Sequence, residues 1–467
     1  MRRKTETVSV CQKQVTGISL AAEESVEVPI HNMDNEKTGR RGFLQTTGAA
    51  FTTSLFTGRV KGANDRVAMA FIGMGRQGRM NMSKALRQPD VAIPAVCDVY
   101  EPHLQAAVKR TGGQAKAVRD FREILADKSI DAVCISTPDH WHAYMTVEAC
   151  KAGKDVWVEK PACVTIEEGQ KMVEAARKYN RVVTAGTIHR SGPHFHKACE
   201  IVRSGQLGKI HWVRTGGGGQ TNPAGCGNPP DSDPPKELNW DMWLGPAPMR
   251  PFNKNRFGVD PHLWSTFRLF WDYAGGPLTD IGVHWIDVLH LALNEPMPSV
   301  VTAVGGRYWL QDNTESPDTL LVSLEYPQMV ATFEQVSNNG FLMGEYGGGM
   351  LFHGTQGTLQ VTRGGYRIIP EAKSDLKAVE VAATPSDASG VADFWLDHMT
   401  NFVACIKSRA KPNSDIETCF RSTAACLLGN IALRNKTRLD WDGKTLRQAE
   451  ARKALASKYR KPWKLVV

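Results

Sequence analysis

The feature that most constrains the fold is a short glycine-rich turn near residue 75. A β-type apolar run over residues 67–72 meets three glycines in G-x-G-x-x-G spacing, and a helix-like segment follows. Such glycines leave no side chain where a pyrophosphate approaches most closely, and backbone N–H groups at the helix N-terminus face the anion. The spacing therefore predicts a strand, a turn and a helix that bind a dinucleotide. The residues of this turn are Gly73, Met74, Gly75, Arg76, Gln77 and Gly78.

An acidic residue follows at the distance that such a site requires. The apolar run over residues 91–100 contains Asp98, about twenty residues after Gly78. A carboxylate there accepts hydrogen bonds from both ribose hydroxyls and repels a 2′-phosphate. Asp98 therefore favours NAD over NADP, the alternative being an acid that caps a turn or helix.

Strand-like and helix-like segments alternate along the next hundred residues. We expect helices at 101–110, 121–127, 142–153 and 166–180, and strands at 131–138, 155–161 and 181–187. This alternation predicts a parallel, doubly wound α/β sheet with its ligand over the carboxyl ends of the strands. The residues at these ends that we expect to contact the cofactor are Ser136, Thr137, Pro138, His140, His142, Glu159 and Lys160.

Lys160 is the most informative of these residues. A surface lysine between an acid and a proline is common. A lysine at the mouth of a buried strand, beside a nicotinamide, is instead partly desolvated and able to donate a hydrogen bond to an oxygen.

Residues 275–288, "GGPLTDIGVHWIDV", form the second candidate site segment. At 3.6 residues per turn, Asp280, His284 and Asp287 share one helix face, and Ile281 and Trp285 share the neighbouring one. On spacing alone, a solvated acid–imidazole pair on an amphipathic helix explains this pattern as well as an active site does.

Five motifs, taken in order, resemble the Gfo/Idh/MocA oxidoreductases. They are residues 73–78 (GMGRQG), 136–143 (STPDHWHA), 159–161 (EKP), 204–210 (SGQLGKI) and 275–284 (GGPLTDIGVH), and the resemblance covers roughly residues 65–440. It implies a Rossmann domain followed by an α/β domain with a largely antiparallel sheet. That sheet packs over the nicotinamide and often joins subunits, which implies a dimer or tetramer. The resemblance also implies that Lys160, Asp280 and His284 line the substrate pocket as catalytic residues, and it does not extend to Asp287.

The segments after residue 190 fit such a second domain. A helix and a strand fit residues 197–214, further strands fit 299–310, 318–326, 329–337 and 357–370, and helices fit 392–408 and 417–435. Residues 215–253 are rich in Gly and Pro, which predicts an irregular functional loop or an arm. Trp240 and Trp243 of this loop, and Trp264 after it, either stack on a sugar ring or are buried. We divide the chain into four parts: an export segment and tail (residues 1–63), the Rossmann domain (64–190), the substrate and oligomerisation domain (191–445) and a C-terminal segment (446–467).

Two residues after the last Rossmann strand are further substrate-site candidates. His189 and Arg190 follow the strand at 181–187 and either face the cofactor and substrate or serve the structure alone. His194 and His196 lack a carboxylate at useful spacing, and the ten cysteines contain no C-x-x-C pair. We therefore predict no metal site.

The N-terminal segment predicts export. Arg40, Arg41, Phe43 and Leu44 resemble a twin-arginine signal, and a mildly apolar stretch follows that is too short for a confident membrane span. The twin-arginine machinery would deliver a folded, cofactor-bearing protein to the periplasm; a basic tail on a cytoplasmic protein is the alternative. Because no nicotinamide pool is obvious outside the cytoplasm, an exported enzyme is expected to keep its NAD tightly bound.

Composition narrows the class of function. The chain has 467 residues and a net charge of +9, but no run of Lys and Arg alternates with aromatics, so nucleic-acid binding is not expected. The sequence predicts an NAD(P)-dependent oxidoreductase that transfers a hydride from a hydroxyl of a sugar, polyol or sugar derivative. The alternatives are a glycosidase that uses a retained NAD for transient oxidation and a non-catalytic protein that binds nucleotide or sugar.

Overall fold

The computed structural model describes residues 66–218, 225–258, 265–294, 297–337, 339, 348–383 and 393–467. The predicted twin-arginine segment and Trp264 lie outside these residues. All statements below concern the described part of the chain.

The first sheet is parallel and confirms the predicted doubly wound domain. Its strand order is β4-β3-β1-β5-β6-β7, with β2 paired to β1, so the order reverses between β1 and β5. A ligand is expected at such a reversal, over the carboxyl ends of the strands. The strands are β1 Val67–Ile72, β2 Val91–Ala92, β3 Ala95–Cys97, β4 Lys116–Val118, β5 Ala132–Ile135, β6 Asp155–Val158 and β7 Val183–Ala185.

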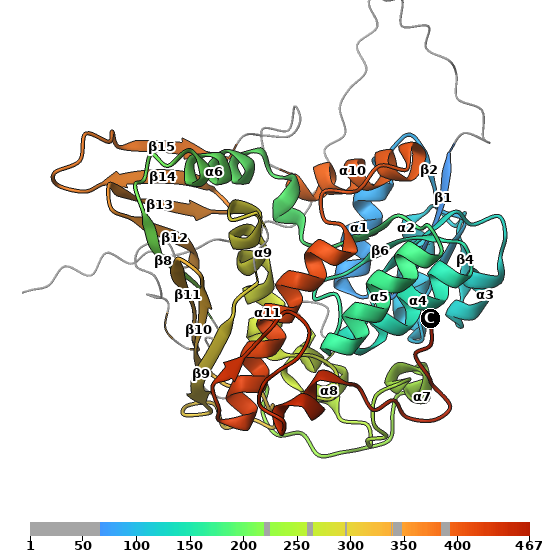
Figure 1. The fold of residues 1–467 in the computed structure, drawn as a ribbon. Helices are drawn as coiled ribbons and strands as arrows, with labels where there is room; N and C mark the ends of the chain where they lie inside the picture. The colour runs from blue at the N-terminus through green and yellow to red at the C-terminus, as the bar shows by residue number, and fades with distance from the viewer. Residues whose placement is uncertain are drawn as a thin grey trace, which may run out of the picture. The chain divides into compact units, whose positions relative to one another are not determined.

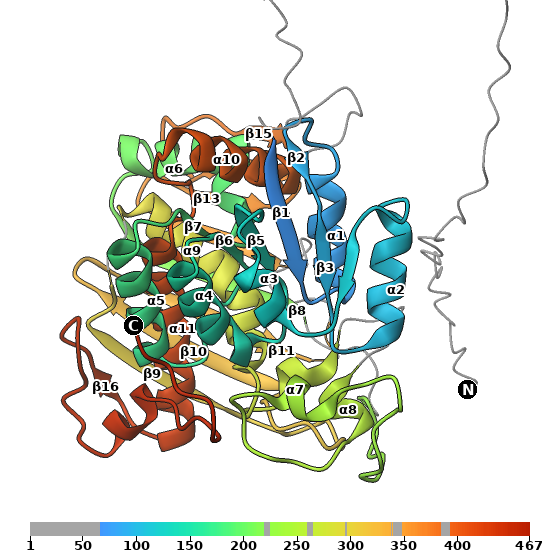
Figure 2. The ribbon, with the colours of Figure 1, turned by 90° about the vertical axis from the view of Figure 1, so that its right-hand side faces the viewer.

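Helices cover both faces of this sheet because successive strand residues point to opposite sides. Met69 and Phe71 of β1 pack with α1 (Arg76–Ala85), α2 (Glu101–Arg110) and α10 (Phe394–Ser408). Ala70 and Ile72 pack in the core of the other face, with α3 (Phe121–Ala126), α4 (His142–Lys151) and α5 (Ile166–Lys178) (Figure 2). The sequence-based division assigned residues 394–408 to the second domain, but in the structure this helix lies against the Rossmann sheet.

The second sheet is largely antiparallel, as expected. Its order is β15-β14-β13-β12-β8-β11-β10-β9-β16, and among these described strands β8 and β11 form the parallel pair. The strands are β8 Ile210–Gly218, β9 Val300–Gly306, β10 Thr319–Tyr326, β11 Met329–Val336, β12 Gly348–Gly354, β13 Gly357–Thr362, β14 Gly365–Pro370, β15 Val379–Ala382 and β16 Leu439–Asp440.

The glycines at 216–218 were predicted to be irregular, and that prediction is wrong. They continue β8 because β11 and β12 pair with the strand on both sides as far as Gly217. A Cβ on Gly217 would lie 3.0 Å from Cγ2 of Ile281. Glycine at this position therefore lets the strand approach the segment that carries Asp280.

Helices cover one face of the second sheet and separate it from the first (Figure 1). Val322 and Phe333 point into this shared core, which α6 (Pro193–Ser204), α9 (Val283–Ala292) and α11 (Ile416–Asn435) complete. Two short helices, α7 (Trp240–Leu244) and α8 (Lys254–Phe257), belong to the loop region. None of the described helices combines the length and apolar character needed to cross a bilayer.

The C-terminal segment returns to the first domain. The ring of Trp463 lies edge-on to Trp141, with centroids 4.9 Å apart, and to Tyr144 at 5.1 Å. The hydroxyls of Ser457 and Tyr459 each lie 2.8 Å from one carboxylate oxygen of Glu168 on α5. These contacts fasten the end of the chain beside α4 and α5 (Figures 1 and 2).

Candidate active site

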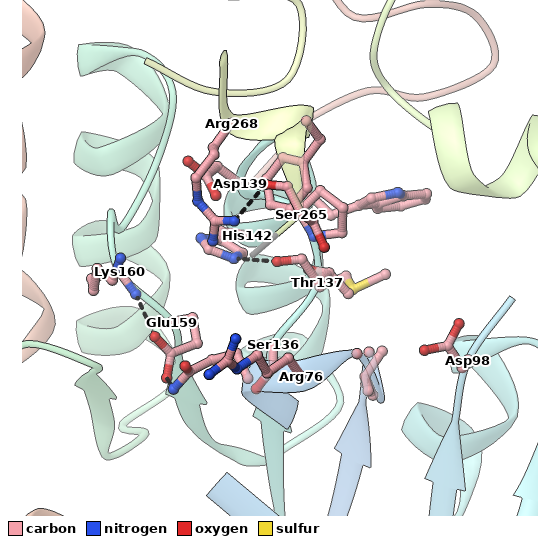
Figure 3. A pocket seen from close by; sticks show the side chains of 18 of the residues that line it. Arg76, Asp98, Ser136, Thr137, Asp139, His142, Glu159, Lys160, Ser265 and Arg268 are labelled. Atoms are coloured by element: carbon pink, nitrogen blue, oxygen red, sulfur yellow. Dashed lines mark hydrogen bonds between the residues drawn. The ribbon is translucent and has the colours of Figure 1, made fainter. Parts of the chain in front are cut away.

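A cavity opens over the carboxyl ends of the Rossmann strands and reaches the second domain. Figure 3 shows Asp98 at one end of it and Lys160 and Arg268 towards the other. Most of the predicted site residues meet here. Those that line the cavity are Gly73, Gly75, Arg76, Gln77, Asp98, Ser136, Thr137, Pro138, His142, Glu159, Lys160, Asp280 and His284.

The glycine turn has the shape that a pyrophosphate needs. Gly73 has φ +86°, and a Cβ there would come within 2.7 Å of the Ser136 and Thr137 backbone; a Cβ on Gly78 would lie 1.9 Å from the Gly73 carbonyl oxygen. A Cβ on Gly75 would instead meet only His103, at an ordinary contact distance of 3.8 Å. Two glycines thus allow close backbone packing, and the third leaves room at the N-terminus of α1, which fits a bound dinucleotide.

Asp98 connects this turn to the end of β3. Its Oδ2 accepts a hydrogen bond from the Met74 N–H at 2.6 Å, and its Oδ1 accepts one from the Tyr100 N–H at 2.9 Å. His103 Nδ1 also lies 3.5 Å from Oδ2. Because a carboxylate has about four acceptor sites, acceptor capacity remains on Asp98 for ribose hydroxyls. Asp98 therefore serves the turn and is also placed to bind an adenosine ribose.

Polar contacts hold the middle of the cavity. Glu159 Oε1 accepts hydrogen bonds from Asn81 at 2.8 Å and from Gln77 at 3.2 Å. The ring of His142 lies between the Pro161 carbonyl oxygen at 2.7 Å and the Thr137 carbonyl oxygen at 3.0 Å. Burial lowers the pKa of His142 to about 4, so the ring is neutral at physiological pH and donates to one of the two oxygens.

At the substrate end, two cations share one carboxylate. Lys160 Nζ lies 2.5 Å from Asp280 Oδ1 and 3.0 Å from the Asp280 carbonyl oxygen, and Arg268 Nε lies 3.2 Å from Asp280 Oδ2. Burial opposes ionisation of Asp280, but Arg268 and Lys160 together hold its pKa well below the usual range. The carboxylate thus fixes the direction in which the Lys160 ammonium points.

The segment with Asp280 and His284 is not the regular α-helix that we predicted. Residues Leu278–Gly282 form a π-turn that leads into α9. The extra residue changes the helical faces: Asp280 and His284 line the cavity, whereas Asp287 is fully buried away from it. Such single π-turns are frequent at functional sites.

His284 is a neutral imidazole at the cavity wall. It is 4% exposed, and its Nδ1 meets no hydrogen-bond partner within the described ranges. Burial, reinforced by the charge of Lys160, holds its pKa well below the usual value. The ring can therefore accept a proton from a group in the cavity.

Five predicted site residues do not line the cavity. Met74 and Gly78 are buried members of the glycine turn, and His189 lies behind His284, with ring centroids 4.9 Å apart. Nε2 of His140 contacts the Trp243 carbonyl oxygen at 3.0 Å. Arg190 is almost fully buried, with its Nε 2.7 Å from Asp287 Oδ2, so its charge is used inside the core.

Sequence reasoning missed three charged residues of the cavity: Asp139, Arg268 and Arg363. Asp139 lies within the STPDHWHA motif, so its position beside two chosen residues could have pointed to it. Burial raises its pKa to about 7, against the opposing effect of Arg268. Arg268 and Arg363 lie in a 3₁₀ turn and a hairpin turn whose local sequence carries no such pattern.

The Gly- and Pro-rich region forms an arm over residues 225–258 and 265–274. Its backbone bonds to the loop after Asp98, through Asn239 N–H to the Val99 carbonyl and Glu101 N–H to the Glu237 carbonyl. Trp240 and Trp243 are buried in the aromatic cluster of the arm, and Trp243 also lines the cavity. The arm thus covers the cavity from the Asp98 end to Arg268.

The described ranges hold no group of three His, Cys, Asp or Glu side chains placed to bind an ion. His194 Nε2 contacts the Thr362 carbonyl oxygen at 3.2 Å and His196 Nε2 contacts the Arg190 carbonyl oxygen at 2.7 Å.

Curated relatives match part of the chain. Myo-inositol 2-dehydrogenase of Thermotoga maritima is 29% identical over 143 residues, which are 31% of this chain and 42% of that protein. A glycosyl hydrolase family 109 protein of Shewanella baltica is 28% identical over 202 residues, covering 37% of this chain and 44% of that protein. The matches thus span less than half the length of these relatives.

Solved structures and family models extend over both domains. A levoglucosan dehydrogenase in complex with NADH and levoglucosan has a TM-score of 0.62 at 19% identity, covering 80% of this chain and 99% of that one, which shows the shared fold. Residues 67–187 match the oxidoreductase family's NAD-binding Rossmann fold, residues 197–304 its C-terminal alpha/beta domain, and residues 254–360 the GFO/IDH/MocA C-terminal domain. With these models matched in order along both domains, the chain belongs to the GFO/IDH/MocA oxidoreductase family.

Proposed function

We propose that this protein is an NAD-dependent oxidoreductase that transfers a hydride from a CH–OH group of a sugar, polyol or sugar derivative. The observation that carries this proposal is the single cavity that joins the glycine turn to Lys160, Asp280 and His284. Relatives named for inositol and levoglucosan support a polyhydroxylated substrate.

The residues of the chain divide the work of the reaction. His284 takes the proton of the reacting hydroxyl, and Lys160 donates a hydrogen bond to the same oxygen. Asp280 and Arg268 hold Lys160 in place. The glycine turn and Asp98 would hold NAD, which would supply the acceptor for the hydride, and the arm would limit the access of water to the reacting atoms.

Asp139 competes with His284 for the role of base. A pKa well below neutrality keeps His284 unprotonated but makes it a weak base, whereas a group with a pKa of about 7 is well matched to neutral pH. We assign the proton transfer to His284 because its Nδ1 lacks any other described partner. His284→Ala and Asp139→Asn variants, compared for turnover and NAD affinity, separate the two assignments.

We propose that the cofactor is resident. The arm covers the cavity and bonds to the loop after Asp98, so release of NAD requires these contacts to open. The test is to purify the protein without nucleotide, denature it and assay the supernatant. NAD in equimolar amount is expected; an empty protein that binds added NAD contradicts residence but not the oxidoreductase function.

A resident cofactor keeps the glycosidase alternative open. The family 109 relative favours it, because that name denotes a glycosyl hydrolase. Release of an aglycone from an aryl glycoside without net nicotinamide reduction would favour the glycosidase, and net reduction by a free sugar favours the dehydrogenase. A protein that binds NAD and sugar but exchanges no hydride would be the non-catalytic alternative, against which the intact Lys160, Asp280 and His284 argue.

We also propose export through the twin-arginine route to the periplasm. Arg40 and Arg41, followed by Phe43 and Leu44, support this proposal, and all four lie outside the described residues. Replacing both arginines by lysine should retain the protein in the cytoplasm, as cell fractionation would show. Equal periplasmic yields of both forms would contradict this route.

We propose further that the outer face of the second sheet joins copies of this chain. Leu321, Val330 and Trp212 are exposed on the neighbouring strands β10, β11 and β8, and Ile369 is exposed on β14 of the same sheet. Exposed apolar side chains grouped on one face are typical of a subunit interface. Light scattering should give a mass of two or four chains, and a monomer at micromolar concentration would contradict this.

A further inference from the structure

Arg363 is a cation of the cavity that the proposed proton and hydride transfers do not use. It lies in the turn between β13 and β14, so it reaches the cavity from the second sheet, whereas Lys160 reaches it from the first. Asp280 and His284 line the same cavity. A substrate held against Lys160 and His284 therefore has Arg363 on its second-domain side.

The Arg363 guanidinium is oriented by a contact behind it. Its Nε donates a hydrogen bond to His189 Nε2 at 3.1 Å. His189 is fully buried and stacks on Phe195, with ring centroids 4.4 Å apart and an interplanar angle of 18°. Because Nε is bound to a fixed ring, the remaining donors of Arg363 are the two terminal amino groups, which form a planar fork.

The acids of the cavity do not neutralise this arginine. No ion pair joins Arg363 to a carboxylate of the described chain, since Asp280 pairs through one oxygen with Lys160 and through the other with Arg268. Of the other carboxyl groups near this end, Asp139 has a pKa of about 7 and carries only part of a negative charge near neutrality. Glu159 accepts hydrogen bonds from Asn81 and Gln77 and forms no ion pair with Arg363. Lys160 and Arg268 are thus paired with Asp280, whereas Arg363 has no ionic partner in the described chain.

The neighbouring imidazoles add no charge to this end of the cavity. Burial holds the pKa values of His189 and His284 well below the usual range, so both rings are neutral. Arg363 is therefore the cation of this end without an ionic partner in the described chain, and a group that accepts two parallel hydrogen bonds from its guanidinium fork would balance its charge.

We infer that the substrate carries a carboxylate and that Arg363 binds it, which makes the substrate a sugar acid such as a uronate or an aldonate. This inference rests on the proposed function, because it places the carboxylate at Arg363 and the reacting hydroxyl at Lys160 and His284. Arg363 thereby determines specificity and takes no part in the transfer of hydride or proton.

The test compares acidic and neutral partners on the NAD-loaded protein. Binding of glucuronate, galacturonate and gluconate, each against glucose, galactose and glucitol, is measured by calorimetry, and hydride transfer is followed separately through nicotinamide absorbance. Arg363→Gln should weaken binding of the acids by about 10- to 100-fold, the range expected for charged hydrogen bonds, and should leave the neutral sugars nearly unchanged. Arg363→Lys, which keeps the charge but not the fork, should fall between.

Arg367→Gln is the matched control. Arg367 lies on the same hairpin, its Nε donates to Gln360 Oε1 at 2.6 Å, and it does not line the cavity. This variant should bind acids as the parent protein does. If Arg367→Gln weakens the binding of the acids as much as Arg363→Gln does, the loss of affinity reflects general surface charge, and the inference is overturned.

The outcomes separate the inference from the proposed function. Acids that bind through Arg363 without hydride transfer would support the carboxylate site and contradict the oxidoreductase. Hydride transfer from neutral sugars with no advantage for acids would support the oxidoreductase and overturn the carboxylate site. Equal affinity for the two members of every pair, including no binding of either, also overturns it.

Discussion

The two ends of the cavity are built in different ways. At the cofactor end, one stretch of chain supplies the glycine turn, Asp98 and the polar residues after β5 and β6, and backbone geometry defines the site. At the substrate end, Lys160, Asp280 and Arg363 come from three elements distant in sequence, and side-chain charge defines the site. We therefore expect changes at the first end to affect NAD binding and changes at the second to affect turnover and specificity.

The largest effect should come from the glycine turn. Gly78→Ala would place a Cβ 1.9 Å from the Gly73 carbonyl oxygen, so the turn must move. The expected cost is about 1–3 kcal/mol in unfolding free energy, with loss of measurable NAD binding. Urea unfolding and NAD titration measure both. Gly75→Ala is the matched control, because its Cβ would meet only His103, at an ordinary contact distance of 3.8 Å: it should keep the stability and lose only affinity. Normal NAD binding by Gly78→Ala would contradict the close-packed turn.

The substrate end should respond in the opposite manner. His284→Ala should lower turnover by about 100- to 10,000-fold, the usual contribution of a general base, while NAD affinity stays the same. Steady-state kinetics and NAD titration give the two values. His211→Ala, at an exposed histidine of β8, serves as control. If His284→Ala lost NAD binding as well, the two ends would not be separable.

Asp98 should affect the choice of cofactor and little else. Asp98→Ala should weaken NAD binding by about tenfold and reduce discrimination against NADP, because the repulsion of a 2′-phosphate is lost. Competition between the two nucleotides measures the ratio. Turnover at saturating NAD should hardly change. An unchanged NAD-to-NADP preference would mean that Asp98 serves only the Met74 and Tyr100 backbone contacts.

The smallest effect should be a pH dependence within the substrate end. Asp139 has a pKa of about 7, so it is mostly neutral below pH 7 and becomes a carboxylate above it. The new charge repels an acidic substrate, so kcat/KM for a sugar acid should fall a few-fold as the pH rises from about 6 to 8. Neutral sugars and the Asp139→Asn variant should show flat profiles. A rise of turnover with pH that Asp139→Asn abolishes would instead make Asp139 the base.

The difference between the two ends also explains what the sequence could predict. The glycine spacing, Asp98 and the strand ends are local patterns, and the structure places nearly all of them around one cavity. His140 also follows a strand end, but its ring contacts the Trp243 carbonyl oxygen because the arm packs there. No sequence pattern predicts the path of the arm.

The substrate end depends on packing between distant segments. A 3.6-residue period placed Asp287 beside Asp280 and His284, but the π-turn moved it to the core, where it pairs with Arg190. Arg268 and Arg363 reach the cavity only because the arm and the β13–β14 hairpin fold over it, and no spacing along the chain encodes that approach. The strand pattern already placed Lys160 beside the cofactor, and resemblance to a family supplied its catalytic role. The resemblance also supplied Asp280 and His284, which periodicity alone left as a solvated pair.

The most direct test of the central claim follows a hydrogen atom from carbon to cofactor. The NAD-loaded protein is mixed with fully carbon-deuterated sugars and sugar acids, quenched, and its nicotinamide analysed by mass spectrometry. The account predicts one deuterium on the nicotinamide ring with the parent protein and a much slower appearance of it with His284→Ala. A nicotinamide that stays unlabelled with every sugar, although sugar and NAD are both bound, would contradict it.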